Sequence, residues 1–289
     1  MRIALGLLVM ALAGSGCATV PYHALDRAYG PGPVLAPGEP QVEQGRPVSV
    51  VDGLGQLFSI PSKLILWDRR VDNHRIGSNT VMVLRSYLDH NRLTNVKVRV
   101  NQYAPGPEFG RLVRNRAVGA GWRYTVGVLS WVVYAILPGR IIGGDHYNPF
   151  SHTINLYSDH PAIALHEGAH ARDLTCRTYK GTYAVAGMLP LVPLYHESIA
   201  TGDVMGYLQE AGNRDSEREA YRILYPAYGT YIGGEFARWN PAVGLVWTVA
   251  GAIPGHVVGR YRARQVRDPD GPVGPDPGEP LIDGETVDR

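Results

Sequence analysis

Two histidines four residues apart, in the segment His166-Glu-Gly-Ala-His170, constrain the local fold more than any other feature of this sequence. In an α-helix, residues at positions i and i+4 lie on one face, one turn apart, so both imidazoles can reach the same metal ion. Glu167 lies about 100° further around such a helix. There it can act as a general base on a zinc-bound water without being a ligand. The spacing therefore predicts a helix that carries a metal site.

The residues before the motif also favour a helix. Asp159 is predicted to cap its N-terminus, and Pro161 is suited to its first turn, where a missing N–H costs little. Residues 153–157 are predicted to form a short strand that leads into it. A strand beside such a helix normally supplies the edge to which an extended peptide adds.

A catalytic zinc site takes three protein ligands and leaves one position open. No third histidine follows His170 at the short spacing of the metzincin pattern, so we expect a carboxylate from a later helix. Three glutamates are candidates for this ligand: Glu197, Glu217 and Glu219. The last two belong to a charged run of the kind that usually forms a solvated helix face.

The segment from Glu197 to Gly212 resembles the third-ligand helix of gluzincin zinc peptidases of the HtpX and CaaX-prenyl-protease types. In that family the ligand Glu is followed by Ala three residues later, and then by Tyr-Leu and Ala-Gly pairs. The matching residues here are Ala200, Tyr207-Leu208 and Ala211-Gly212. The resemblance covers roughly residues 78–215 and favours Glu197 as the third ligand over Glu217 and Glu219.

This resemblance implies an α+β fold, a zincin-like minigluzincin domain that is mostly helical with a small sheet and an HExxH helix. It also implies a zinc-dependent endopeptidase with one Zn²⁺ per chain. The metal ligands would be His166, His170 and Glu197, and the general base Glu167.

The chain departs from the family directly after Ala200, where Thr201 replaces the expected Asp and Asp203 follows two positions later. In the family that Asp orients a ligating His. Asp203, Thr201 and Asp173 are the candidates for this role. The departure keeps open an alternative function, a catalytically silent peptidase-like lipoprotein that acts as a binding or assembly factor.

A tyrosine or a further histidine opposite the metal could stabilise the oxyanion of a peptidase. The sequence does not choose among the candidates, which are Tyr221, Tyr225, Tyr228, Tyr231, His146, His152, His160, His196 and His256. Each of these histidines is first expected to be a structural or surface group.

The segments around the motif alternate between helix and strand patterns. Apolar residues at helical spacing predict a helix over 78–91, and a second helix is expected over 108–118. Residues 96–100 alternate valine with Lys97 and Arg99, which predicts a half-buried strand with both charges outward. This order of elements favours the α+β class.

Three apolar stretches, 124–137, 183–195 and 242–258, are interpreted as buried helices or hairpins. Prolines interrupt them, and the first two are too short to cross a bilayer. Shallow contact with a membrane is the alternative.

The N-terminus is typical of an export signal, with Arg2 before the apolar residues 3–13. Small residues then precede Cys17, an order that resembles a bacterial lipoprotein signal, in which the cysteine is lipidated. Ala18 after the cysteine suggests sorting to the outer membrane, facing the periplasm. The alternative is an ordinary cleaved signal with an incidental cysteine.

Composition divides the chain into a signal peptide (1–17), a flexible Pro- and Gly-rich tether (18–48), a peptidase-like domain (49–266) and a disordered tail (267–289). The formal net charge of +2 gives no support to a nucleic-acid partner. The expected partners are a protein or peptide substrate in extended form and the membrane, through the lipid anchor. If Cys17 carries lipid, Cys176 has no intrachain partner, so the fold must hold without disulfides.

Overall fold

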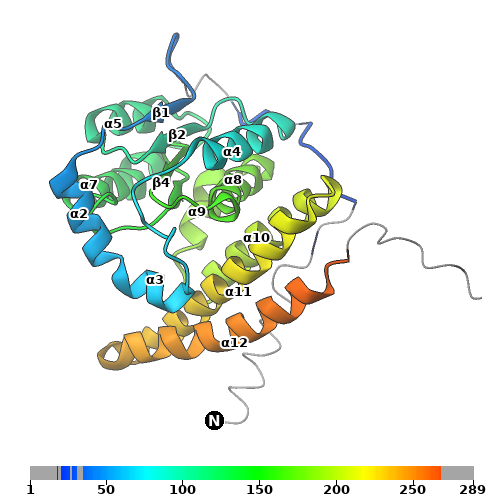
Figure 1. Ribbon diagram of the computed structural model, residues 1–289. Coiled ribbons are helices and arrows are strands. Elements are labelled where there is room, and N and C mark those ends of the chain that lie inside the picture. Colours follow the sequence, from blue (N-terminus) through cyan, green and yellow to red (C-terminus); the bar gives the residue numbers. More distant parts are fainter. Residues whose placement is uncertain (1–17, 19–20, 27, 31–34, 268–289) are drawn as a thin grey trace, which may run out of the picture.

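The computed structural model describes residues 18, 21–26, 28–30 and 35–267. The predicted signal peptide, Cys17 and the predicted tail beyond Arg267 lie outside these residues. The described part of the chain is α+β, mostly helical with one four-stranded mixed sheet (Figure 1).

The strands in sheet order are β1 (Val42–Gln44), β2 (Lys97–Val100), β4 (Thr153–Leu156) and β3 (His146–Asn148). β1, β2 and β4 run parallel, and β3 is antiparallel to β4. β4 is therefore an inner strand and β3 is an edge strand. The expectation that the strand directly before the motif helix supplies the free edge is wrong, because β3 pairs with it on that side.

The helices, in chain order, are α2 (Ser49–Phe58), α3 (Ile60–Leu66), α4 (Ser78–His90), α5 (Pro105–Arg114), α6 (Ala120–Trp122), the π-helix η1 (Arg123–Gly127), α7 (Val128–Ile136), α8 (Pro161–Cys176), α9 (Lys180–Ala186), α10 (Val192–Glu210), α11 (Arg214–Ala237), the 3-10 helix η2 (Pro241–Val243) and α12 (Gly244–Gln265). In Figure 1 the sheet and α4, α5, α7 and α8 form one half of the molecule, and the long helices α10, α11 and α12 form the other.

The main core lies where α4, α8, α10 and the inner strands meet, and α8 runs through it. Gly168, inside the motif, allows α4 to approach, because a Cβ there would lie 2.9 Å from the ring of Tyr87. Leu88 on α4 and Val204 on α10 are fully buried on either side. Burial of side chains of this size stabilises the fold by about 1.5–3 kcal/mol each. The core therefore fixes α8 between α4 and α10.

The predicted strand over 96–100 is confirmed as β2, but Lys97 and Arg99 do not point outward. Both side chains are completely buried. The Lys97 ammonium lies 3.0 Å from Glu43, and the Arg99 guanidinium donates to Glu108 at 2.5 Å. These carboxylates come from other elements and make burial of the two charges tolerable.

The predicted flexible tether, 18–48, is also corrected. Tyr22, Leu25 and Tyr29 are buried, and residues 42–44 form a strand of the sheet. The Tyr22 hydroxyl donates to Asp203 at 3.1 Å. These apolar and aromatic side chains contribute enough buried surface to hold a segment that is otherwise rich in Pro and Gly.

Asp159 was predicted to be the N-cap of α8, and this prediction is wrong. His160 is the N-cap, and its side chain accepts a hydrogen bond from the Ala162 N–H. Asp159 instead accepts from the Gly77 N–H at 2.9 Å and from the Thr80 hydroxyl at 2.6 Å. A tertiary contact with the start of α4 thus outweighs the local role. Pro161 does lie in the first turn, as predicted.

The apolar stretch 242–258 forms η2 and most of α12, and it is not buried as expected. Among the described residues, Pro241–Gln265 is the one helical segment long and apolar enough to cross a membrane by length and composition, and 28% of its most apolar window is buried. The stretch 124–137 falls in η1 and α7, where Leu129 and Ile136 are exposed.

Candidate metal centre

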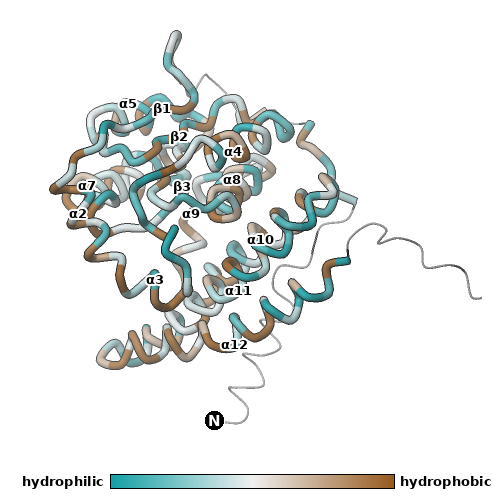
Figure 2. The backbone as a smooth tube through the Cα atoms, viewed as in Figure 1, coloured by the Kyte–Doolittle hydropathy of each residue, from teal (hydrophilic) through white to brown (hydrophobic). Residues whose placement is uncertain are grey.

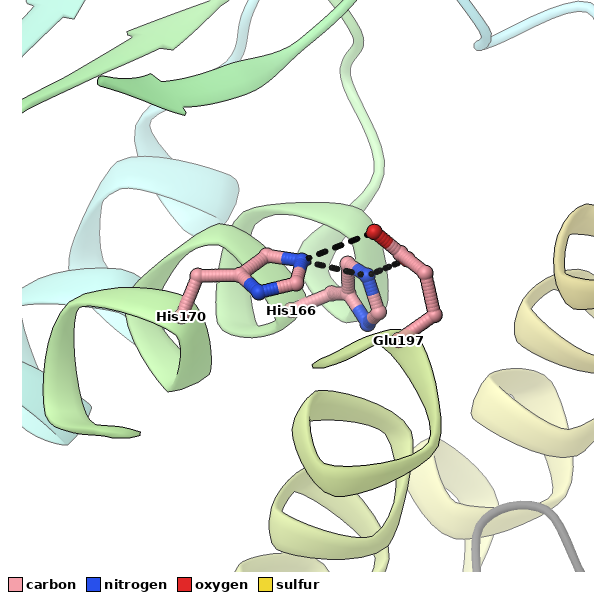
Figure 3. A group of neighbouring side chains, drawn as sticks. All are labelled: His166, His170 and Glu197. Atoms are coloured by element: carbon pink, nitrogen blue, oxygen red, sulfur yellow. Dashed lines mark hydrogen bonds and ion pairs between the residues drawn. The ribbon is translucent and has the colours of Figure 1, made fainter. Parts of the chain in front are cut away.

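The two motif histidines lie on one face of α8, as their spacing predicts. Their Nε2 atoms are 3.1 Å apart, and the rings are nearly perpendicular, at 85° (Figure 3). His166 is buried and His170 is partly exposed. Both nitrogens therefore converge on one point beside the helix.

Glu197, in the second turn of α10, brings its carboxylate to that point. Its Oε2 lies 2.8 Å from Nε2 of His166, and its Oε1 lies 3.4 Å from Nε2 of His170 (Figure 3). One donor atom from each residue lies within 4.8 Å of the others, so the three side chains could hold a metal ion. Two imidazoles and a carboxylate are a donor set that suits a catalytic zinc ion. These residues therefore fit the metal that the motif suggests.

The two alternative third ligands lie elsewhere. Glu217 accepts hydrogen bonds from Gln209 at 2.8 Å and from Arg214 at 3.0 Å. Glu219 forms an ion pair with Arg70 at 2.6 Å. Both carboxylates are occupied on α11, away from the histidine pair, so only Glu197 joins the cluster.

Glu167 faces a cavity of about 520 Å³ that is also lined by His170 and Glu197. The edge strand β3 lines the same cavity through its three residues 146–148. The candidate general base, two of the three candidate metal ligands and a strand edge therefore share one cavity.

Burial dominates the electrostatics of this cavity. It raises the pKa of Glu167 to about 8, against the opposing effect of His170. Burial also raises the pKa of Glu197, but His170 and His166 outweigh it and hold that pKa well below its usual range. Glu197 is thus held as a carboxylate, the form that binds a metal.

Within the described residues, none of the three residues predicted to orient a ligating histidine makes a hydrogen bond to one. Asp203 accepts from the hydroxyls of Tyr22 and Tyr87 and from Arg172, and so joins α10 to α4 and α8 on the side away from the cavity. Asp173 accepts from the Tyr183 hydroxyl at 2.5 Å and from Arg177.

Thr201, the third of these candidates, is buried on α10. Nδ1 of His166 is buried and has no partner among the described residues. A group that fixes this ring from behind, which is usual in histidine metal sites, is therefore not provided by the predicted residues.

Of the four tyrosines that the sequence left open, Tyr231 lies in the cavity. It comes from α11, which contacts the motif helix. The residue is 44% exposed, and the charge of Glu197 is the main cause that raises the pKa of its hydroxyl well above the usual value, so it remains a proton donor. Of the histidines that the sequence left open, His146 and His196 also line the cavity, and His196 stacks on Tyr183 with ring centres 4.3 Å apart.

Comparisons of the chain with protein-family models, with curated proteins and with solved structures found no match.

Proposed function

We propose that this protein is a zinc-dependent endopeptidase of the bacterial cell envelope, with a zincin-like domain of the gluzincin type. The observation that carries the proposal is the convergence of His166, His170 and Glu197 on one point beside Glu167, in a cavity large enough for part of a peptide. The resemblance of the segment 197–212 to the gluzincin third-ligand helix supports the same reading.

The three ligands would hold one zinc ion, which supplies Lewis acidity toward the scissile carbonyl and lowers the pKa of a bound water. In its carboxylate form, Glu167 takes a proton from the attacking water and delivers it to the leaving amine nitrogen. The hydroxyl of Tyr231, which lies beside Glu197, donates a hydrogen bond to the carbonyl oxygen as negative charge develops there. Each of these side chains lines or borders the cavity.

The edge strand β3 favours an extended substrate. In the described part of the chain it has a strand partner, β4, on one side only, and its residues line the cavity. An extended peptide can add to such an edge through backbone hydrogen bonds, with its scissile bond beside Glu167. We therefore propose an unfolded or extended segment of an envelope protein as substrate, for an enzyme anchored by lipid at Cys17 in the outer membrane and facing the periplasm.

A second candidate is the catalytically silent binding or assembly factor. It is favoured by the unpartnered Nδ1 of His166 and by the engagement of Asp203 with Tyr22, Tyr87 and Arg172. A histidine that is not fixed from behind binds metal 10–100-fold more weakly, by the general behaviour of such sites.

One experiment separates the two candidates. The full chain, the Glu167→Gln variant and the matched surface variant Glu219→Gln are purified, their zinc is quantified, and cleavage of an unfolded protein substrate is measured. If the protein is a peptidase, we expect stoichiometric zinc in all three proteins and loss of cleavage in Glu167→Gln alone. Zinc without cleavage in the wild type supports the silent factor. Absence of zinc in the wild type contradicts the peptidase but not the silent factor, which does not require a metal.

A further inference from the structure

Helix α12 carries an apolar face that no described part of the chain covers. Val246, Val249, Ile253 and Val257 follow one another at intervals of three or four residues, so they lie along one side of the helix. Val246, Ile253 and Val257 are 63, 56 and 65% exposed. A stripe of this length is unusual on a surface that meets only water.

The opposite side of α12 packs through glycine. Gly251, Gly255 and Gly259 are four residues apart, and a Cβ added to any of them would lie within 2.5 Å of a backbone oxygen of α11. On α11, Gly229 makes the reciprocal approach. α11 and α12 form a helical hairpin. In a hairpin surrounded by water, the large apolar side chains would fill the interface between the two helices. Here glycines fill it and the large side chains point outward, which is the arrangement of helices that pack within lipid.

The charged residues lie at the two ends of this apolar segment. No Asp, Glu, Lys or Arg occurs between Arg238 and Arg260, and Arg264 follows one turn later. Trp239, next to Arg238, is 86% exposed. Tryptophan and arginine at the two ends of an apolar segment match the interfacial layer of a bilayer, and the positive charges complement anionic headgroups.

Helices α2 and α3 extend this surface. Val50, Phe58 and Leu64 are exposed on them, and α3 contacts α12. His256 of α12 hydrogen-bonds the Ile65 carbonyl at 2.7 Å and stacks on Trp67. In Figure 2 the hydrophobic parts of α2, α3 and the N-terminal half of α12 lie on the same side of the molecule. We call this surface, formed by α2, α3 and the outward side of α12, the apolar hairpin face.

We propose that the apolar hairpin face inserts into the headgroup and outer acyl region of an anionic lipid bilayer. The apolar side chains enter the bilayer, and the arginines at the two ends of the uncharged segment remain at headgroup level. Lipid binding by this face does not require a metal, so it can succeed or fail independently of the proposed peptidase.

The first test places an environment-sensitive dye on the face. In the full chain carrying Cys17→Ser and Cys176→Ser, a nitrobenzoxadiazole label is attached at Leu245→Cys or, as the matched control, at Asp215→Cys. Leu245 is 64% exposed on the face, and the Asp215 side chain is 98% exposed at the far end of α11. With phosphatidylglycerol vesicles, we expect a blue shift and quenching by a lipid-phase quencher at 245 alone.

Three results would overturn the proposal: no change at 245, equal changes at both positions, or a blue shift at 245 before vesicles are added together with a doubled particle mass. The last result would mean that a second copy of the chain covers the face.

A second test measures vesicle co-sedimentation of the Cys17→Ser chain with and without Val246→Gln, Ile253→Gln and Val257→Gln. The apolar residues 3–13 are common to both proteins, so the difference reports α12 alone. We expect at least tenfold weaker binding of the triple variant and no change for Met82→Gln, which alters an exposed apolar residue on α4. Equal binding by the triple variant and its parent would contradict the proposal.

Discussion

The substitution Gly168→Ala tests how the core positions the motif helix. The new Cβ would lie 2.9 Å from two ring carbons of Tyr87 and 3.2 Å from Leu84. Carbon atoms prefer about 3.5–4.0 Å, so α8 and α4 must separate by roughly 0.6 Å or more. The ring of Tyr87 cannot turn aside freely, because it is fully buried and its hydroxyl is bonded to Asp203.

Two effects of opposite sign determine how much Gly168→Ala changes the free energy of unfolding. Overpacking of a core costs about 1–3 kcal/mol. Replacement of glycine by alanine within a helix gains about 1 kcal/mol. We expect Gly168→Ala to lower the free energy of unfolding by up to about 2 kcal/mol, which is a fall in Tm of up to roughly 8 °C for a domain of this size.

Thermal unfolding followed by circular dichroism measures this change. The matched control is Gly53→Ala on α2, where a Cβ would meet nothing within 4 Å. The control should leave the Tm unchanged or raise it. A Gly168→Ala variant that gains as much stability as Gly53→Ala does would refute the packing that we describe around the motif.

Three further substitutions test other parts of the structure. Burial, followed by Asp145, raises the pKa of Asp72 to about 8. Its proton therefore stabilises the folded state fully below about pH 4, and this contribution is lost as the pH rises to 8. Asp72→Asn should raise the free energy of unfolding by about 1–3 kcal/mol at pH 9, with little change at pH 4, as measured by urea denaturation; an equal effect at both pH values would contradict this. Tyr231→Phe should lower kcat by about 10²–10³-fold with KM and bound zinc unchanged, if its hydroxyl stabilises the oxyanion. Glu108→Gln removes one of the two carboxylates paired with the buried Arg99, with Glu43 remaining at 3.1 Å, and should cost about 1.5–3 kcal/mol in the same denaturation assay, so an unchanged midpoint would argue against that ion pair.

The sequence predicted the features that depend on local spacing. His166 and His170 share a face of α8 because positions i and i+4 of any helix do so, and the α-helical and β-strand periods located α4 and β2. Glu197 could be chosen only by resemblance, because nothing local links it to histidines about thirty residues earlier.

The errors arose where a distant partner decided the outcome. Alternation in β2 implied that Lys97 and Arg99 faced water, but glutamates from β1 and α5 surround them. Asp159 had the sequence position of an N-cap for α8, but its carboxylate accepts a hydrogen bond from the Gly77 N–H at the start of α4. Composition suggested a free tether, and two buried tyrosines, Tyr22 and Tyr29, were enough to dock it.

The central claim is that His166, His170 and Glu197 form a zinc site, and its most direct test is the zinc affinity of the full chain in competition with a chelator. The account predicts one zinc ion per wild-type chain. It predicts binding at least a hundredfold weaker in Glu197→Gln, because a ligand is lost rather than a supporting contact. Glu217→Gln and Glu219→Gln, which change the alternative ligands, should bind as the wild type does. A wild type without zinc, or a Glu197→Gln variant that binds as tightly as the wild type, would contradict the claim.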